Sequence, residues 1–192
     1  MSPYAKEKFT KKDGRTYYKD ATYRSRIGID VSHHQGQIDW QQVKADGIEF
    51  AFIRIGYRGY GEEGSLKEDT EALRNIENAG KAGVEVGVYF FSQAVNEEEA
   101  VEEADFVLKA LQGKKLELPV VFDPENILDD DARTDYVSKE QFTQNAIAFC
   151  EKIKETGYTP AVYCNMMWEA YKLDLSKLES YDIWYADYEA TP

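Results

Sequence analysis

The sequence predicts an α/β fold in which parallel strands alternate with helices and close into a (β/α) barrel. Six short apolar segments alternate with segments of helical pattern, which is typical of βαβ units and a parallel sheet. Acidic residues stand at or just beyond three of the predicted strand ends, and a (β/α) barrel forms its active site from such ends. An open, doubly wound sheet is the alternative, but no Walker motif marks one.

The strands are expected where short apolar runs are bounded by Gly, Pro or polar residues. They fall at residues 26–30, 50–55, 84–91, 120–124, 160–164 and 181–186. Residues 56–61 are rich in glycine without a following Lys-Ser or Lys-Thr pair, so we interpret them as a mobile loop at the rim. Residues 1–25 are polar and lack a clear period, and we expect an arm or a linker there, followed by one domain over residues 26–192.

Helices are expected between these strands, at residues 38–45, about 66–82, from 97 onward, 139–154 and about 166–171. Asn96 and Ser138 are suitable N-cap residues, and Gly47, Gly83 and Gly157 mark helix ends. The glutamates that follow Asn96 favour the positive end of a helix dipole, so they need no ligand to explain them.

The composition narrows the class of protein. A hydrophobic content of 43% indicates a folded globule, and a formal net charge of −13 makes nucleic acid and anionic membranes unfavourable partners. No apolar run approaches the roughly 20 residues of a membrane span. We expect either a cytoplasmic protein or one whose leader or anchor is not part of this chain. Cys150 and Cys164 lack metal-ligand spacing and are expected to be free, buried thiols.

The stretch from Leu118 to Asn126 holds the clearest chemistry of the chain. Asp123 and Glu125 follow a buried apolar run, with Pro124 between them. Alternate strand residues share a face, so both carboxyls are expected on one side, with their Cα atoms roughly 6.5–7 Å apart. Because two buried acids side by side favour a bound proton, this arrangement suits general acid catalysis. Two solvated acids at the exit of a strand are the alternative interpretation.

Other polar residues allow a metal site, but a structural role is preferred for each. Asp30, His33 and His34 could hold a metal ion in a metal-dependent hydrolase, whereas hydrogen bonding within the loop explains the two histidines more simply. The acidic residues 129–131 are interpreted as a solvated loop. Arg54 is expected to orient a carboxylate rather than to contact a substrate.

Five motifs in order resemble glycoside hydrolase family 25, the lysozymes that act as N-acetylmuramidases on bacterial peptidoglycan. The resemblance runs from about residue 27 to residue 192. The motifs are Gly28-Ile-Asp-Val-Ser-His-His-Gln-Gly36 with its continuation to Arg54, Asp69, Gly87-Val-Tyr-Phe-Phe91, the Asp-x-Glu of Asp123 and Glu125, and Trp184-Tyr-Ala-Asp-Tyr188.

The resemblance implies an irregular, flattened (β/α) barrel that cleaves the β-1,4 bond between N-acetylmuramic acid and N-acetylglucosamine. It implies that Glu125 is the general acid, that Asp123 stabilises the charge formed at the sugar, and that Asp30 lines the same pocket. An Asp-x-Glu on one strand also fits attack by the 2-acetamido oxygen of the substrate, an exception to the usual pair of catalytic carboxylates. The candidate substrate-binding residues are Tyr57, Tyr89, Phe91, Tyr163, Trp184, Asp187 and Tyr188.

The resemblance further implies a metal-free enzyme without a cofactor, acting as a monomer on peptidoglycan at the cell surface or outside the cell. For Glu125 to act as an acid near neutral pH, burial and Asp123 must raise its pKa. The chain departs from the family in ending at Pro192, before the expected final strands, and in carrying Pro124 inside Asp-x-Glu. A catalytically silent module that binds peptidoglycan or another glycan is therefore the alternative function.

Overall fold

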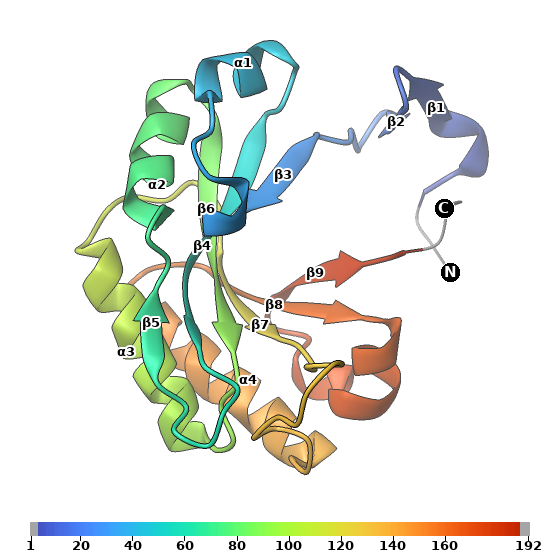
Figure 1. Ribbon diagram of the computed structural model, residues 1–192. Coiled ribbons are helices and arrows are strands. Elements are labelled where there is room, and N and C mark those ends of the chain that lie inside the picture. The colour runs from blue at the N-terminus through green and yellow to red at the C-terminus, as the bar shows by residue number, and fades with distance from the viewer. Residues whose placement is uncertain (1–3, 189–192) are drawn as a thin grey trace.

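A curled, mostly parallel sheet forms the body of the protein, and the computed structural model describes residues 4–188 (Figure 1). The strand order of this 7-stranded sheet is β3-β4-β6-β7-β8-β9, with β5 paired to β4. The bounds of the strands are Gly28–Val31 (β3), Phe50–Arg58 (β4), Leu66–Glu68 (β5), Glu85–Ser92 (β6), Val120–Pro124 (β7), Pro160–Asn165 (β8) and Asp182–Ala186 (β9). Every pair on the path from β3 to β9 is parallel.

The sheet curls into a half-barrel that is open between β3 and β9 (Figure 1). Within residues 4–188 each of these two strands is paired on one side only. The predicted α/β fold, an irregular (β/α) barrel that lacks some of its strands, is therefore confirmed. Residues 189–192 of the predicted domain lie outside the described residues.

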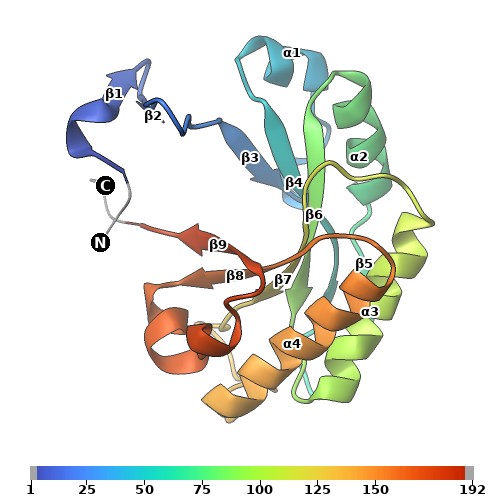
Figure 2. The same ribbon diagram turned by 180° about the vertical axis from the view of Figure 1, so that it is seen from behind.

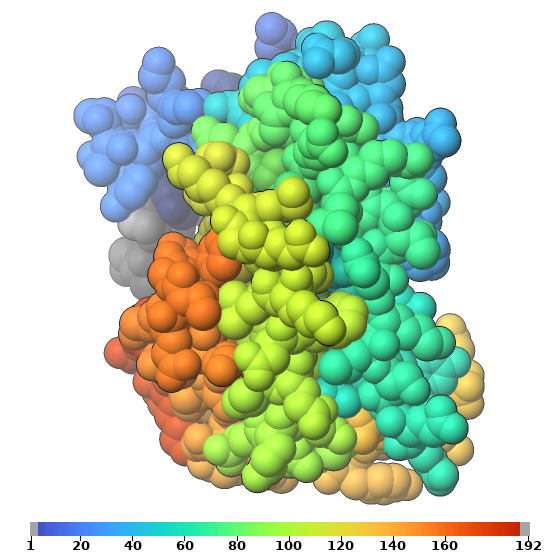
Figure 3. Space-filling view, turned by 90° about the vertical axis from the view of Figure 1, so that its left-hand side faces the viewer, coloured from blue at the N-terminus to red at the C-terminus, as the bar shows by residue number. Residues whose placement is uncertain are grey.

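Helices cover the convex face of the sheet. Their bounds are Trp40–Ala45 (α1), Ala72–Lys81 (α2), Glu97–Leu111 (α3) and Lys139–Glu155 (α4). Figure 2 shows α3 and α4 side by side against the sheet, and α2 and α3 make up much of the surface seen in Figure 3. Asn96 and Ser138 cap α3 and α4 through their side chains, as predicted. The remaining turns are short, at Lys6–Lys8 (η1), His33–Gln35 (η2), Trp168–Lys172 (η3, a π-helix) and Leu175–Lys177 (η4).

The predicted helix over residues 66–82 is wrong in its first part. Residues Leu66–Glu68 form β5, which pairs antiparallel with the end of β4, and α2 begins only at Ala72. The pairing exists because β4 continues to Arg58, beyond its predicted end at Ile55. Gly59, Gly61 and Gly64 have the spacing of a dinucleotide-binding loop, but they join these two antiparallel strands instead of opening a helix, so the loop lacks the context that such binding needs.

Residues before β3 include an antiparallel hairpin of Phe9–Lys12 (β1) and Arg15–Tyr18 (β2). Asp13 and Gly14 form its turn with φ of 50° and 75°, positive values typical of a two-residue hairpin turn. The Arg15 guanidinium donates to the backbone oxygen of Asp46, 2.6 Å away, at the end of α1. This contact ties the hairpin to the barrel domain.

The main hydrophobic core lies between the sheet and its helices, and it includes Phe90, Phe122 and Phe149. Cys150 and Cys164 are buried in this core and are free, as predicted. A small second cluster lies on the other face of the sheet, where Val121, Ala161 and Tyr163 meet partly buried aromatic rings. Among the described residues, no helix is long and apolar enough to cross a membrane.

Candidate active site

A cavity of about 450 Å³ opens at the carboxyl ends of the parallel strands. Three acids and five of the predicted aromatic residues make up most of its lining. Its lining consists of Asp30, Ser32, His34, Arg54, Tyr89, Phe91, Asp123, Glu125, Tyr163, Trp184, Ala186 and Tyr188. A larger hollow of about 610 Å³ lies at the opposite ends of the strands, but Lys114, Lys115 and Glu117 are its charged residues, and it contains no pair of acids. The chemistry therefore points to the smaller cavity.

Asp123 and Glu125 both line this cavity, together with Asp30. Strand β7 ends at Pro124, and Asp123, the residue before it, is only 6% exposed. Both acids face the same cavity, as the sequence predicts, although Glu125 lies one residue beyond the end of the strand. The Oδ1 atom of Asp123 has no hydrogen-bond partner among the residues that the structure describes. A buried carboxylate oxygen without a partner is costly, so it is available to a bound group.

The environment of the cavity disfavours the ionised forms of both acids. Burial raises the pKa of Asp123 well above its ordinary value, the charges of Glu125 and Asp30 raise it further, and Arg54 opposes them. Burial also raises the pKa of Glu125, Asp30 adds to the effect, and a hydrogen bond from Tyr163 lowers it. Because two acids so close cannot both ionise freely, the pair retains a proton at a higher pH than isolated carboxyls would.

Arg54 is held by Asp69, in the loop between β5 and α2. The Arg54 Nε donates to Asp69 Oδ2 at 2.9 Å, and the backbone N–H of His33 donates to the same oxygen at 3.0 Å. Arg54 also lies 2.5 Å from Nδ1 of His33. The same Nδ1 lies 3.1 Å from Asp69 Oδ2, so His33, Arg54 and Asp69 form one polar cluster. Both the expected pairing of Arg54 with a carboxylate and the expected hydrogen-bonding role of His33 are thus present.

Among residues 4–188, no group of three or more His, Cys, Asp and Glu side chains is arranged to hold a metal ion. The histidine nearest to the acids in sequence, His33, is bound instead to Asp69 and Arg54. His34 lines the cavity, and its backbone N–H donates to Ser32 Oγ at 3.3 Å.

Aromatic rings form one wall of the cavity. The Trp184 ring stacks on Phe52 with 4.8 Å between centroids and meets the edges of Tyr89 and Tyr163 at 5.9 and 5.4 Å. The hydroxyls of Tyr163 and Tyr188 are 2.9 Å apart. Burial raises the pKa values of Tyr89 and Tyr163, so both hydroxyls stay protonated and can donate at neutral pH.

Two of the predicted binding residues do not line this cavity. The Tyr57 ring lies against the Arg54 guanidinium, 5.2 Å from its central carbon. Asp187 lines a neighbouring hollow of about 400 Å³, together with Met166, Met167 and Tyr185. Tyr188 lines both the cavity and this hollow.

The sequence assigned no role to two residues of the lining, Ser32 and Ala186, and it suggested for His34 only a metal ligand or a hydrogen-bonding residue of the loop. Ala186 follows Trp184 by two positions on β9, so the alternation of strand side chains could have predicted that both residues face the cavity. Ser32 and His34 lie in the turn after β3, where no periodic pattern predicts the direction of a side chain.

Comparison with known proteins gives the chain its family. The sequence model described as Glycosyl hydrolases family 25 matches residues 29–192. Lysozyme M1 of Streptomyces globisporus is 38% identical over 79 residues, which are 41% of this chain and 24% of that protein. The autolytic lysozyme of Clostridium acetobutylicum is 25% identical over 162 residues, 84% of this chain and 44% of that protein. The chain thus spans less than half the length of these relatives.

Solved structures share the fold. A family 25 glycosyl hydrolase from Bacillus anthracis superposes with a TM-score of 0.70 at 24% identity, covering 92% of this chain and 76% of that one. The modular autolysin LytC from Streptococcus pneumoniae gives a TM-score of 0.74 at 23% identity, covering 94% of this chain and 43% of that one. With the family model matched from the first strand of the sheet to the end of the chain, this protein belongs to glycosyl hydrolase family 25.

Proposed function

We propose that the protein is an N-acetylmuramidase, a lysozyme that hydrolyses the β-1,4 bond between N-acetylmuramic acid and N-acetylglucosamine in peptidoglycan. Its membership of a glycosyl hydrolase family and the lysozymes among its relatives support this function. The observation that carries it is the cavity in which Asp123 and Glu125 lie with Asp30 beside an aromatic wall. Acids supply the proton transfer that glycoside hydrolysis needs, and aromatic rings can stack on sugar faces.

In the proposed mechanism, Glu125 protonates the glycosidic oxygen as the bond to the sugar C1 breaks. The 2-acetamido oxygen of the same sugar attacks C1, and Asp123 accepts a hydrogen bond from the acetamide N–H and stabilises the cationic ring that forms. Water then attacks C1 as the bond between C1 and the acetamido oxygen breaks, and the water gives its proton to Glu125, which restores the acid. The raised pKa of Glu125 keeps its proton available, and the unpartnered Oδ1 of Asp123 suits the N–H donor.

The proposed substrate is a peptidoglycan glycan strand, and the proposed site of action is the cell wall, at the cell surface or outside the cell. Similar structures include LytC, described in complex with a synthetic peptidoglycan ligand, and the CTP1L endolysin. Trp184 and Tyr188 are the proposed sugar contacts, because both rings line the cavity beside the acids. We further propose that the protein acts as a monomer.

The Glu125→Gln substitution tests the proposal. It removes the transferable proton while keeping the size of the side chain, so the initial rate of wall clearing, followed by turbidity, should fall by at least about 100-fold. Binding to walls, measured by cosedimentation, should persist. The matched control is Glu155→Gln, an exposed glutamate at the end of α4, which should clear walls at the wild-type rate.

Equal clearing by the wild type and Glu125→Gln would reject Glu125 as the acid. A wild-type protein that binds walls without clearing them would identify the chain as a silent glycan-binding module instead.

A further inference from the structure

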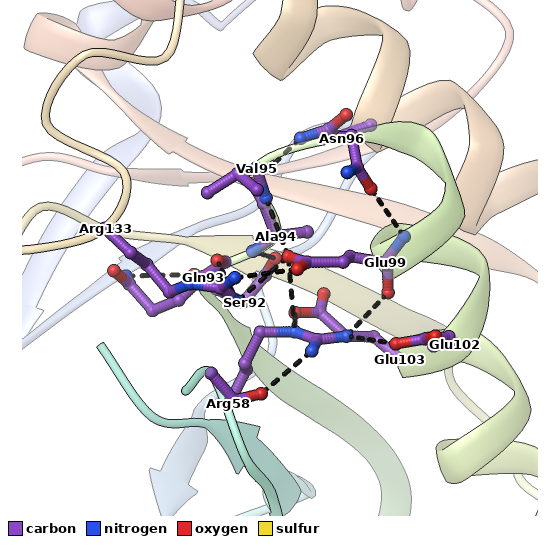
Figure 4. A network of polar contacts seen from close by, with 12 residues as sticks. Arg58, Ser92, Gln93, Ala94, Val95, Asn96, Glu99, Glu102, Glu103 and Arg133 are labelled. Carbon is purple, nitrogen blue, oxygen red and sulfur yellow. Dashed lines mark hydrogen bonds and ion pairs between the residues drawn. The ribbon is translucent and has the colours of Figure 1, made fainter. Parts of the chain in front are cut away.

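A buried polar network lies behind the cavity, at the ends of β4 and β6 and the start of α3. Its members are Arg58, Gln93, Glu99, Glu103 and Arg133 (Figure 4). Gln93 is 1% exposed and Glu103 is fully buried. None of these residues lines the cavity, and the proposed mechanism uses none of them. The network nevertheless reaches Glu125 through one contact.

Glu125 lies just beyond the ladder that holds β7. The pairing of β7 with β8 ends at Phe122 and Val162, and its pairing with β6 ends at Pro124 and Ser92. Pro124 has no N–H to donate, which weakens the ladder at its last position. The backbone that carries Glu125 therefore depends on contacts outside the sheet.

Gln93 supplies such a contact. Its Nε2 donates to the backbone oxygen of Glu125 at 2.7 Å, and its Oε1 accepts from the Thr134 hydroxyl at 2.9 Å. A carbonyl oxygen can only accept, so the amide must turn its nitrogen toward Glu125. One side chain thus joins the residues on either side of the loop over residues 126–133, which follows the proposed acid.

The far end of that loop is clamped as well. Arg133 binds both carboxylate oxygens of Glu99, at 2.7 and 2.9 Å, and the main-chain oxygen of Glu99 accepts from Arg58 at 2.9 Å. Glu99 lies in the first turn of α3, so the loop is fixed to a rigid element (Figure 4). Bidentate pairs of this kind restrict direction as well as distance.

We propose that Gln93 is a positioning residue for Glu125, holding the backbone of the proposed acid so that its carboxyl stays inside the cavity. The inference rests on the proposed function for its effect on catalysis. Its basis is the side-chain amide of Gln93, which binds Glu125 and Thr134 at once and is buried.

The Gln93→Met variant tests the proposal in the full chain. Methionine keeps the length of the side chain and loses both hydrogen bonds. The maximal rate of wall clearing per folded protein should fall by about tenfold or more, while the wall concentration for half-maximal rate changes little, because misplacing a reacting group lowers turnover more than binding.

The pH dependence gives a second measurement. Glu125 shares the cavity with Asp30, Asp123 and Tyr163, and burial raises its pKa. If Gln93→Met lets Glu125 move toward water, that pKa falls, so the alkaline limb of the pH–rate profile moves to lower pH. An NMR titration of the Glu125 carboxyl should move the same way, and it needs no substrate.

The control is Asn145→Leu. Asn145 is fully buried on α4 and donates to the backbone oxygen of Ala94 at 2.8 Å, without a contact to Glu125. The Asn145→Leu variant should be less stable than the wild type, but it should clear walls at the wild-type rate and keep the wild-type titration of Glu125. If Gln93→Met fails to fold, Gln93→Ala replaces it, because alanine also removes both hydrogen bonds and brings neither bulk nor charge into the buried layer.

A folded variant at position 93 with the wild-type turnover and the wild-type Glu125 titration would overturn the proposal. Failure of the proposed function is a separate outcome: the wild type and Glu125→Gln would then clear walls equally, whereas the substrate-free titration would still respond to Gln93→Met.

Discussion

Asp30 is the most exposed of the three acids in the cavity, yet it acts on both of the others. Its negative charge raises the pKa of Asp123 and that of Glu125. A neighbouring negative charge makes each proton harder to lose, so Asp30 extends the pH range over which the pair keeps a proton. Asp30 thus has a proposed role that does not require it to touch the scissile bond.

The Asp30→Asn substitution should move the alkaline limb of the pH–rate profile to lower pH. Removing the charge lowers the pKa of Glu125, and the protonated acid is then lost at a lower pH. Clearing should be severalfold slower on the alkaline side and less affected at acidic pH. Asp129→Asn, on the exposed loop, is the control and should leave the profile in place. An unmoved alkaline limb in Asp30→Asn would contradict this electrostatic role.

At the scale of the element, strand β4 contains an irregularity that decides where its second arginine lies. The register against β6 shifts between Arg54 and Gly56. In a regular strand Arg54 and Arg58 would share a face, whereas a bulge exchanges the faces of the residues beyond it. Arg54 therefore lines the cavity, and Arg58 turns to the other side, where it is 4% exposed and binds Glu103 at 2.8 Å.

The pair of Arg58 and Glu103 should make stability depend on pH. Burial raises the pKa of Glu103 from 4.5 to about 7, against the opposing effect of Arg58. A raised pKa in the folded state means that the proton favours folding, so this contribution is complete below pH 4.5 and is lost as the pH rises through about 7. It amounts to at most about 3 kcal/mol.

Chemical denaturation of the wild type and Glu103→Gln across this pH range measures the contribution. The free energy of unfolding of the wild type should fall as the pH rises through about 7, and the variant should lose that part of the pH dependence. Glu102→Gln is the matched control: Glu102 also contacts Arg58, but its side chain is 62% exposed, so the slope should remain. Identical slopes for the wild type and Glu103→Gln would count against a protonated Glu103.

The turn between β4 and β5 depends on a glycine at position 64. Gly64 has φ of 53°, and a Cβ there would collide with the Arg133 guanidinium. Gly64→Ala should therefore cost about 1–3 kcal/mol of unfolding free energy and loosen the Arg133–Glu99 pair. Gly61→Ala provides the comparison, because a Cβ at that position meets nothing within 4 Å. Thermal unfolding of the two variants measures the difference, and equal midpoints would refute the clash.

At the scale of the whole molecule, one face of the sheet is used for stability and the other for chemistry. Helices α2, α3 and α4 bury the convex face in the main core, while the concave face carries the acids and a thin aromatic cluster. The carboxyl ends of the parallel strands also meet at one edge of the sheet, an arrangement typical of (β/α) barrels. It explains how acids from β3 and β7, 93 positions apart between Asp30 and Asp123, come to share one cavity.

Much of this architecture could be predicted from local pattern. The alternation of strands and helices, the caps at Asn96 and Ser138, and the common face of Asp123 and Glu125 all depend on a period of two or 3.6 residues or on one capping side chain. Such signals act within a few neighbouring residues, so they are readable without the fold. The family motifs added the expectation that Asp30 belongs to the same site.

Only the tertiary structure decided which side chains meet across the sheet. The pairing of β5, the place of Asp69 beside Arg54 and the contact of Gln93 with Glu125 each depend on how distant segments pack together. The turn of Arg58 away from the cavity depends on the irregularity in the register of β4. Register is set by packing between segments that are far apart in the chain, and a shift of one residue reverses the face of every side chain beyond it. The sequence by itself therefore determined the elements and the acids, and packing determined the partners that hold them.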